Sequence, residues 1–185
     1  SNLAEIELIL ATSTLLGKLD FKNFTIRIND RQILKAMAAF SGFAPESFDE
    51  VFIILDKMDK IGLEGVESEL KEAGYEAQVV ETYLTLFKEV TRDVEGIRYL
   101  KEKLDGVLDP EEADGLQTII STVEAEKEAE FKMSFDPTLV RGMSYYTGTI
   151  FEISMDEFGG SVGGGGRYDK MIGKFTGQDT PACGF

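Results

Sequence analysis

Two short strings in the last third of the chain carry the residues best suited to binding a charged ligand. The first spans residues 139–148, where Arg141 precedes the adjacent pair Tyr145 and Tyr146. Arginine can bind a carboxylate or a phosphate through two parallel N–H donors, and paired tyrosines provide aromatic walls with hydroxyls at their tips. Such a set suits an amino acid or a nucleotide. Taken alone, however, the string favours a surface ion pair at Arg141 and tyrosines that belong to a sheet core.

The second string is a run of four glycines, residues 163–166, followed directly by Arg167, Tyr168 and Asp169. Where side chains are absent, the backbone can approach a ligand closely. The run is not a Walker loop, because the next Gly-Lys pair comes two residues too late and is followed by Phe175. It also lacks the context of a dinucleotide-binding turn. A flexible hairpin linker explains the glycines equally well when they are considered alone.

Composition excludes several kinds of chemistry. The chain has no histidine and a single cysteine, Cys183, so it offers no internal disulfide and no zinc ligand set. Nucleophiles that depend on an imidazole base are excluded for the same reason. No run of ~18 apolar residues is present, and we therefore expect a soluble, cytoplasmic protein without a membrane span or signal sequence. We expect the Ser1-Asn2 start, which resembles a tag-cleavage scar, and the end at Phe185 to be cuts in a longer protein.

The elements that must position these strings divide by charge. Residues 45–130 contain 24 acidic and 9 basic side chains, whereas the rest of the chain contains equal numbers of each. Within this window, apolar residues recur at three- and four-residue spacing, which predicts four or five amphipathic helices, the last of them from Pro110 to about residue 130. Asp56 and Asp59 stand beside lysines, and we expect them to lie on a solvated helix face rather than to bind a metal.

Outside the window, the pattern predicts a sheet. Residues 6–16 indicate a mostly buried helix, residues 24–28 alternate as a strand, and Asn29 or Asp30 caps a helix that ends at Gly42. Residues 131–135 and 149–153 have the pattern of further strands. We therefore expect an α+β chain in three parts: 1–44 (helix, strand, helix), a helical insertion at 45–130, and 131–185, which carries the two strings.

Together, in this order and spacing, the two strings resemble the two signature motifs of histidyl-tRNA synthetases. The first motif usually reads Leu-Val-Arg-Gly-Leu-Asp-Tyr-Tyr-Thr and the second Gly-Gly-Gly-Arg-Tyr-Asp, while residues 181–185 are similar to the entry to class II motif 3. Residues 24–31 and 55–62 also resemble the family's core strand and insertion, so the likeness covers nearly the whole chain. It implies part of the antiparallel catalytic sheet of a class II synthetase with an inserted helical domain.

The resemblance also implies an activity and roles. The parent enzyme would form histidyl-adenylate from histidine and ATP, with Mg²⁺, and transfer histidine to tRNA(His); it would be a homodimer. Arg141 would be catalytic and would contact the α-phosphate and the histidine carboxylate. Tyr145, Tyr146 and Tyr168 would line the histidine pocket, and Gly164 and Gly165 would form part of its wall. No metal would be held by this chain's own residues.

Two departures from the family pattern matter. Ser144 stands where the family usually has Asp, which removes a charge and changes the local electrostatics. Class II motifs 1 and 2 are absent from the chain, and we expect it to be inactive by itself and to bind histidine and ATP weakly or not at all. The alternatives are a regulatory paralogue that activates ATP phosphoribosyltransferase and a synthetase-like binding domain that senses tRNA. Arg141 and the three tyrosines argue against the regulatory paralogue.

Overall fold

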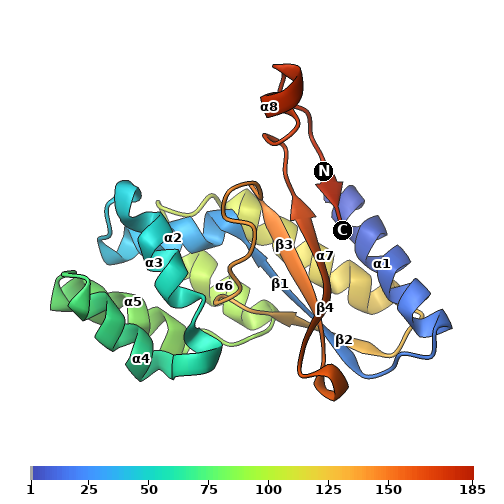
Figure 1. Ribbon diagram of the computed structural model, residues 1–185, viewed down its shortest axis with the longest axis horizontal. Helices are drawn as coiled ribbons and strands as arrows, with labels where there is room; N and C mark the ends of the chain where they lie inside the picture. Colours follow the sequence, from blue (N-terminus) through green and yellow to red (C-terminus); the bar gives the residue numbers. More distant parts are fainter. Residues whose placement is uncertain (1) are drawn as a thin grey trace.

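The computed structural model describes residues 2–185 and contains one five-stranded mixed sheet (Figure 1). The strand order is β2-β1-β3-β4-β5, and every neighbouring pair is antiparallel except β1 and β2. The strands are β1 (Phe24–Asp30), β2 (Phe131–Phe135), β3 (Thr149–Met155), β4 (Gly160–Arg167) and β5 (Cys183–Gly184). The parallel pair is possible because a long helical connection separates β1 from β2. The predicted α+β class with a mostly antiparallel sheet is confirmed. Ser1 lies outside the described residues.

The two faces of the sheet differ in chemistry because successive side chains on a strand point to opposite sides. Ile26 and Ile28 on β1, with Phe151 and Ile153 opposite them on β3, are almost fully buried. Helices α1 (Leu3–Lys18) and α7 (Pro110–Glu126) lie against the sheet (Figure 1). Arg27 pairs in register with Glu152, so both belong to the other face. We call this second surface the charged face of the sheet.

Helix α2 (Arg31–Ser41) begins directly at the end of β1, as the sequence predicted. The carboxylate of Asp30 accepts a hydrogen bond from the backbone N–H of Gln32 at 2.8 Å, which satisfies one of the free donors of the first turn. Gly42 ends the helix in the left-handed region with φ 111°. Since no residue separates β1 from α2, the position of this helix start is fixed by the sheet.

Residues 45–126 form the predicted helices, and α3, α4 and α5 gather at one end of the molecule (Figure 1). A short 3-10 turn, η1 (Pro45–Ser47), precedes α3 (Phe48–Leu55), α4 (Met58–Glu72), α5 (Ala77–Glu89) and α6 (Val94–Lys103), and α7 completes the set. Helix α7 stops at Glu126, short of the predicted end near residue 130, because Lys127 adopts an extended conformation on the way to β2. The division into parts at 1–44, 45–130 and 131–185 stays a prediction.

The glycine run is not a linker. Residues 163–166 lie within β4 and pair with β3, and Gly166 also pairs with β5, so the flexible-hairpin interpretation was wrong. The loop η2 (Asp156–Phe158) connects β3 to β4, and the hairpin that carries α8 (Gly173–Thr176) projects away from the body (Figure 1). Among residues 2–185, no helix has the length and apolar character needed to cross a membrane.

Candidate functional site

Arg141 lies at the edge of the charged face, held between two carboxylates. Its Nε donates to Oε2 of Glu152 at 2.7 Å, and its Nη1 donates to Oδ1 of Asp56 at 2.6 Å and to the carbonyl of Val140 at 3.0 Å. Burial disfavours the charged form of this arginine, yet the two carboxylates outweigh it and raise its pKa above the usual value. The Arg141 side chain is 45% exposed, so a ligand can reach a guanidinium that stays charged.

Glu152 joins Arg141 to a second arginine. Its other oxygen, Oε1, accepts from Nη2 of Arg27 at 2.9 Å, and the Glu152 side chain is only 5% exposed. Nη1 of Arg27 donates to the fully buried Asp136 at 2.8 Å. Oδ2 of Asp136 also pairs with Arg92 at 3.1 Å, and its Oδ1 accepts from Thr138. The result is a chain of alternating charges across β1, β3 and the segment after β2.

Asp56 and Asp59 both belong to this network. Their side chains are exposed, as the sequence predicted, at 45% and 64%, but Asp56 also pairs with Arg141, and Asp59 lies 3.4 Å from Nη1 of Arg27. The sequence did not predict these ion pairs. The physical reason is tertiary. Asp56 follows α3 directly, and the turn into α4 passes over the charged face, so both carboxylates find guanidinium partners that local spacing could not reveal.

The backbone of the Arg141 segment is fixed by side chains at the junction of β1 and α2. Asn29 Nδ2 donates to the carbonyl of Leu139 at 3.2 Å, and Gln32 Nε2 donates to that of Thr147 at 3.1 Å. Arg31 donates through Nη2 to the carbonyl of Met143 at 3.3 Å. Since β1 and the α2 start form one rigid unit, these bonds set the position of the segment that carries Arg141 and the tyrosines.

The three predicted tyrosines lie near one another, next to glycines of β4 and β5. The rings of Tyr145 and Tyr146 are 4.5 Å apart in an edge-on arrangement. A Cβ placed at Gly166 would lie 2.9 Å from the ring of Tyr146, and one at Gly184 would lie 2.7 Å from the Tyr168 hydroxyl. Burial raises the pKa of Tyr146, and the neighbouring Tyr145 and Tyr168 add to the shift. The Tyr146 hydroxyl is therefore a neutral donor at neutral pH.

The glycines of β4 divide between the two faces of the sheet. Gly164 is exposed and pairs in register with Glu152, so it lies on the charged face. A Cβ at Gly165 would instead meet the Phe151 ring at 2.7 Å and the Gly184 carbonyl at 2.2 Å. The structure therefore brings Gly164 close to the Arg141 network, whereas the missing side chain of Gly165 points to the opposite face and makes room for β5.

Arg167, in the second string, ties the glycine strand to α1. Its Nε donates to Oε1 of Glu5 at 2.5 Å, and its Nη1 donates to Asp169 at 2.9 Å. Glu5 is almost completely buried. The hydrogen bond to Glu5 is the main cause that raises the pKa of Arg167, and this arginine therefore acts as a permanent structural cation.

Ser144 is exposed, and its carbonyl lies 3.4 Å from Lys174 Nζ.

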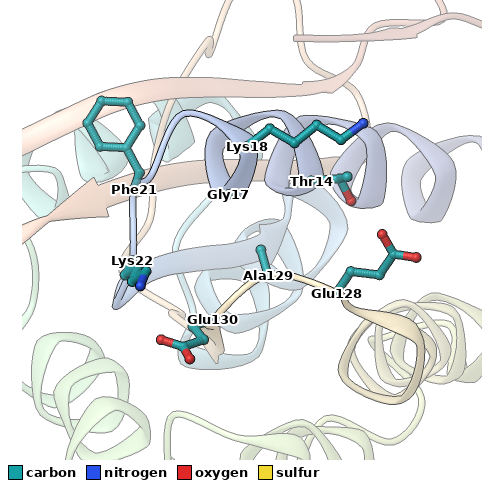
Figure 2. Close-up of a pocket in the computed structure, with 8 residues that line it drawn as sticks. All are labelled: Thr14, Gly17, Lys18, Phe21, Lys22, Glu128, Ala129 and Glu130. Atoms are coloured by element: carbon teal, nitrogen blue, oxygen red, sulfur yellow. The ribbon is translucent and has the colours of Figure 1, made fainter.

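One surface pocket lies apart from Arg141 and the tyrosines. One of about 300 Å³ is lined by residues of α1 and the turn after it, together with the segment that precedes β2 (Figure 2). Figure 2 shows Lys18 and Lys22 alongside Glu128 and Glu130, with Ala129 close to Gly17. This pocket contains none of the predicted site residues. Among residues 2–185, no group of three or more His, Cys, Asp or Glu side chains is arranged to hold a metal ion.

The sequence interpretation missed the carboxylates of the network that holds Arg141 and Arg27. Glu152 lies in the alternating strand 149–155, where an acidic residue amid apolar neighbours signals a buried charge that needs a partner. Asp136, directly after β2, has the same signature because it follows a strand and precedes Pro137. Asp56 carries no comparable local signal.

The mostly antiparallel sheet, with its helical connection between β1 and β2, has the architecture predicted for part of a class II synthetase. The model of the protein family described as "Histidyl-tRNA synthetase" matches residues 1–185. The chain therefore belongs to the histidyl-tRNA synthetase family, as the two strings indicated. The histidine–tRNA ligase of Leifsonia xyli is 44% identical over 100% of this chain and 44% of its own length. The chain thus spans less than half the length of this curated relative.

Solved structures agree on the fold. The crystal structure of histidyl-tRNA synthetase from Nostoc sp. PCC 7120 has a TM-score of 0.84 at 24% identity and covers 98% of this chain and 43% of that one. A Bacillus halodurans protein described as an ATP phosphoribosyltransferase regulatory subunit/histidyl-tRNA synthetase has a TM-score of 0.82 at 20% identity and covers 99% of this chain and 47% of its own. At these identities the likeness concerns the fold alone.

Proposed function

We propose that the chain is part of a histidine–tRNA ligase, which joins histidine to ATP as histidyl-adenylate and then transfers histidine to tRNA(His). The observation that carries the proposal is Arg141, which keeps its charge and is 45% exposed at the edge of the glycine strand. A fixed cation there would stabilise the negative charge that gathers on the α-phosphate during adenylate formation.

Each string residue would then have a role. Arg141 would contact the histidine carboxylate and the α-phosphate. The neutral Tyr146, with Tyr145 and Tyr168 beside it, would line the pocket of the histidine side chain, and the exposed backbone at Gly164 would form part of its wall. Gly165 would contribute by letting β5 approach rather than by touching histidine. ATP would enter with its Mg²⁺ as substrate, and the parent enzyme would be a cytoplasmic homodimer.

The regulatory paralogue is the main rival, since the fold likeness extends to a protein described as such a subunit. The two functions differ in what they require of the site. A regulatory subunit needs the fold but no fixed cation for an α-phosphate, whereas adenylate formation needs Arg141 free to bind an anion. The presence of Arg141 and the three tyrosines in the two strings, and the contacts that hold Arg141 charged, favour the ligase.

Amino-acid-dependent exchange of pyrophosphate into ATP by the full-length protein tests the proposal. Histidine should support exchange at least ~100-fold faster than any other amino acid, because the tyrosine-lined pocket would select the imidazole. Absence of exchange with every amino acid would make the regulatory paralogue the better account. The isolated 185-residue chain should bind histidine and ATP weakly or not at all by calorimetry; binding in the millimolar range or tighter would contradict this expectation.

A further inference from the structure

The helices of residues 45–126 contribute three charges to the site network. Asp56 pairs with Arg141, Asp59 with Arg27, and Arg92 with Asp136. Each of these pairs joins a residue in the helical segment to one on the charged face or directly beside it. The helical segment is therefore connected electrostatically to the guanidinium proposed to meet the α-phosphate.

The three contacts differ in how much they can affect orientation. Arg27 is held by two buried carboxylates, those of Glu152 and Asp136, so the longer contact with Asp59 adds little to its position. Arg141 has a single buried partner, Glu152, which binds only Nε. Because the guanidinium is planar and rigid, a single bond at Nε would let the whole group pivot about that contact. Nη1 is held by Asp56 Oδ1 at 2.6 Å and by the adjacent Val140 carbonyl at 3.0 Å, and the Asp56 contact is the one that comes from the helical segment.

Two fixed points determine the plane of a guanidinium. Glu152 and Asp56 bind Nε and Nη1, and among residues 2–185 no contact of Arg141 uses Nη2. The two N–H groups of Nη2 are then the donors available to an anion. Each of these two N–H groups can donate to a different oxygen of a bound ligand, and the orientation of the guanidinium plane sets the direction of both.

We propose that Asp56 is a positioning residue, which orients Arg141 from the helical segment so that its Nη2 edge faces the ligand. This inference rests on the proposed function in assigning the ligand, but the geometry it concerns is that of Arg141 and Asp56 alone. Asp56 does not touch the reacting atoms. It acts through Arg141, and it makes the alignment of this arginine depend on the placement of the turn between α3 and α4.

Pyrophosphate exchange by the full-length protein tests the role, with Asp56→Ala, Asp56→Asn and Asp59→Ala compared. Asp56→Ala should lower kcat ~10-fold or more while the KM for histidine changes less than ~2-fold, because misalignment weakens contacts that strengthen in the transition state. Asp56→Asn keeps an acceptor oxygen at the same place and should stay within ~3-fold of wild type. Asp59→Ala is the matched control, because Arg27 keeps its two buried partners, and should stay within ~2-fold.

A structural readout separates this inference from the proposed function. In the 185-residue chain, the Arg141 Nε–H signal in NMR should exchange with water at least ~5-fold faster in Asp56→Ala than in Asp56→Asn or Asp59→Ala. The thermal midpoint of Asp56→Ala should move by less than ~2 °C, since the pair is exposed on both sides. These outcomes would support Asp56 as a positioning residue even if the full-length protein showed no histidine-dependent exchange, in which case only the ligase proposal would fail.

Other outcomes overturn the inference. Equal losses of kcat in Asp56→Ala and Asp56→Asn would mean that the charge of Asp56, not its hydrogen bond, is required. A several-fold lower KM for histidine or ATP in Asp56→Ala would mean that Asp56 competes with the ligand for Arg141. Unchanged kcat together with an unchanged Nε–H exchange rate would mean that Glu152 alone orients the guanidinium.

Discussion

Glu152 binds Arg141 through one carboxylate oxygen at 2.7 Å while its second oxygen accepts from Arg27 at 2.9 Å. A nearly buried carboxylate thus serves two cations at once; its loss would leave Arg141 without its buried partner and Arg27 with Asp136 as its one buried partner. Breaking a buried ion pair by removing one member usually costs ~3–5 kcal/mol, because the remaining charge stays desolvated.

Replacing Glu152 by Gln should therefore destabilise the chain by about 2–4 kcal/mol, as measured by urea unfolding. The amide keeps one acceptor oxygen but directs an N–H₂ group at an arginine. Glu157→Gln, an exposed acidic change in the η2 loop, is the control and should shift stability by less than ~0.5 kcal/mol. Neutral surface substitutions usually change the free energy of unfolding by less than ~0.5 kcal/mol. A change as small as this for Glu152→Gln would contradict a structural role for this carboxylate.

The glycines of β4 should differ in their tolerance of alanine. A Cβ at Gly165 would stand 2.2 Å from the Gly184 carbonyl, a backbone atom that can move only if β5 separates from β4. At Gly163 the nearest atoms would be 3.6 Å away, at ordinary contact distance. Gly165→Ala should cost about 2 kcal/mol or more in chemical unfolding, and Gly163→Ala less than ~1 kcal/mol. Equal costs would show that β5 does not pack on β4 as described.

Asp30 should make stability depend on pH in an unusual direction. Burial raises the pKa of Asp30 to about 7, and the nearby charges of Glu112 and Glu5 add to the rise while the N–H of Gln32 opposes it. The folded state therefore binds a proton that the unfolded state releases near pH 4. The contribution of Asp30 is fully present below that pH and is lost as the pH rises towards 7.

Asp30→Asn should remove this contribution, since asparagine also caps helices. The free energy of unfolding of the variant relative to wild type should increase by roughly 2 kcal/mol between pH 4 and pH 7.5. Urea titrations across this range measure it. Glu111→Gln, on the exposed start of α7, serves as the control and should give a flat difference. A flat difference for Asp30→Asn as well would mean that Asp30 is ionised throughout.

Replacing Tyr83 by phenylalanine should not destabilise the chain. Its ring is fully buried between Phe43 and Phe87, and its hydroxyl has no hydrogen-bond partner among residues 2–185. Removing a buried, unsatisfied hydroxyl should leave stability unchanged or raise it by about 1 kcal/mol. Tyr75→Phe is the matched change, because the Tyr75 hydroxyl donates to Glu50 at 2.6 Å. Thermal unfolding should rank Tyr83→Phe above Tyr75→Phe, and the reverse order would indicate a partner for Tyr83.

Local sequence patterns were sufficient to predict the helices and strands and to recognise the two strings. Asp30 and Gly42 marked the ends of α2 because capping and left-handed termination are properties of the residues themselves. Arg141 and the tyrosines were recognisable by type and order. The partners of Arg141 could not be found in this way. Asp56 and Arg141 are 85 residues apart, and only the turn after α3 passing over the sheet brings them together.

The glycine run illustrates the opposite error. Glycines commonly mark loops, and the sequence alone left a linker as an equal alternative. In the structure, the need is steric: β5 and the ring of Tyr146 approach the backbone so closely that Gly165 and Gly166 leave no space for a side chain. This approach involves residues almost 20 positions away along the chain, as in the pairing of Gly166 with Gly184, and was not visible from local pattern.

Exchange of pyrophosphate by the full-length protein carrying Arg141→Ala tests the central claim most directly. If Arg141 supplies the fixed cation at the α-phosphate, the variant should lose at least ~100-fold in histidine-dependent exchange, equivalent to ~2.7 kcal/mol of transition-state stabilisation. The variant should remain folded, and its thermal midpoint, measured in parallel, checks this. Exchange within ~3-fold of wild type by a folded Arg141→Ala protein would contradict the account, because the contacts between Glu152 and Arg141 would then serve structure alone.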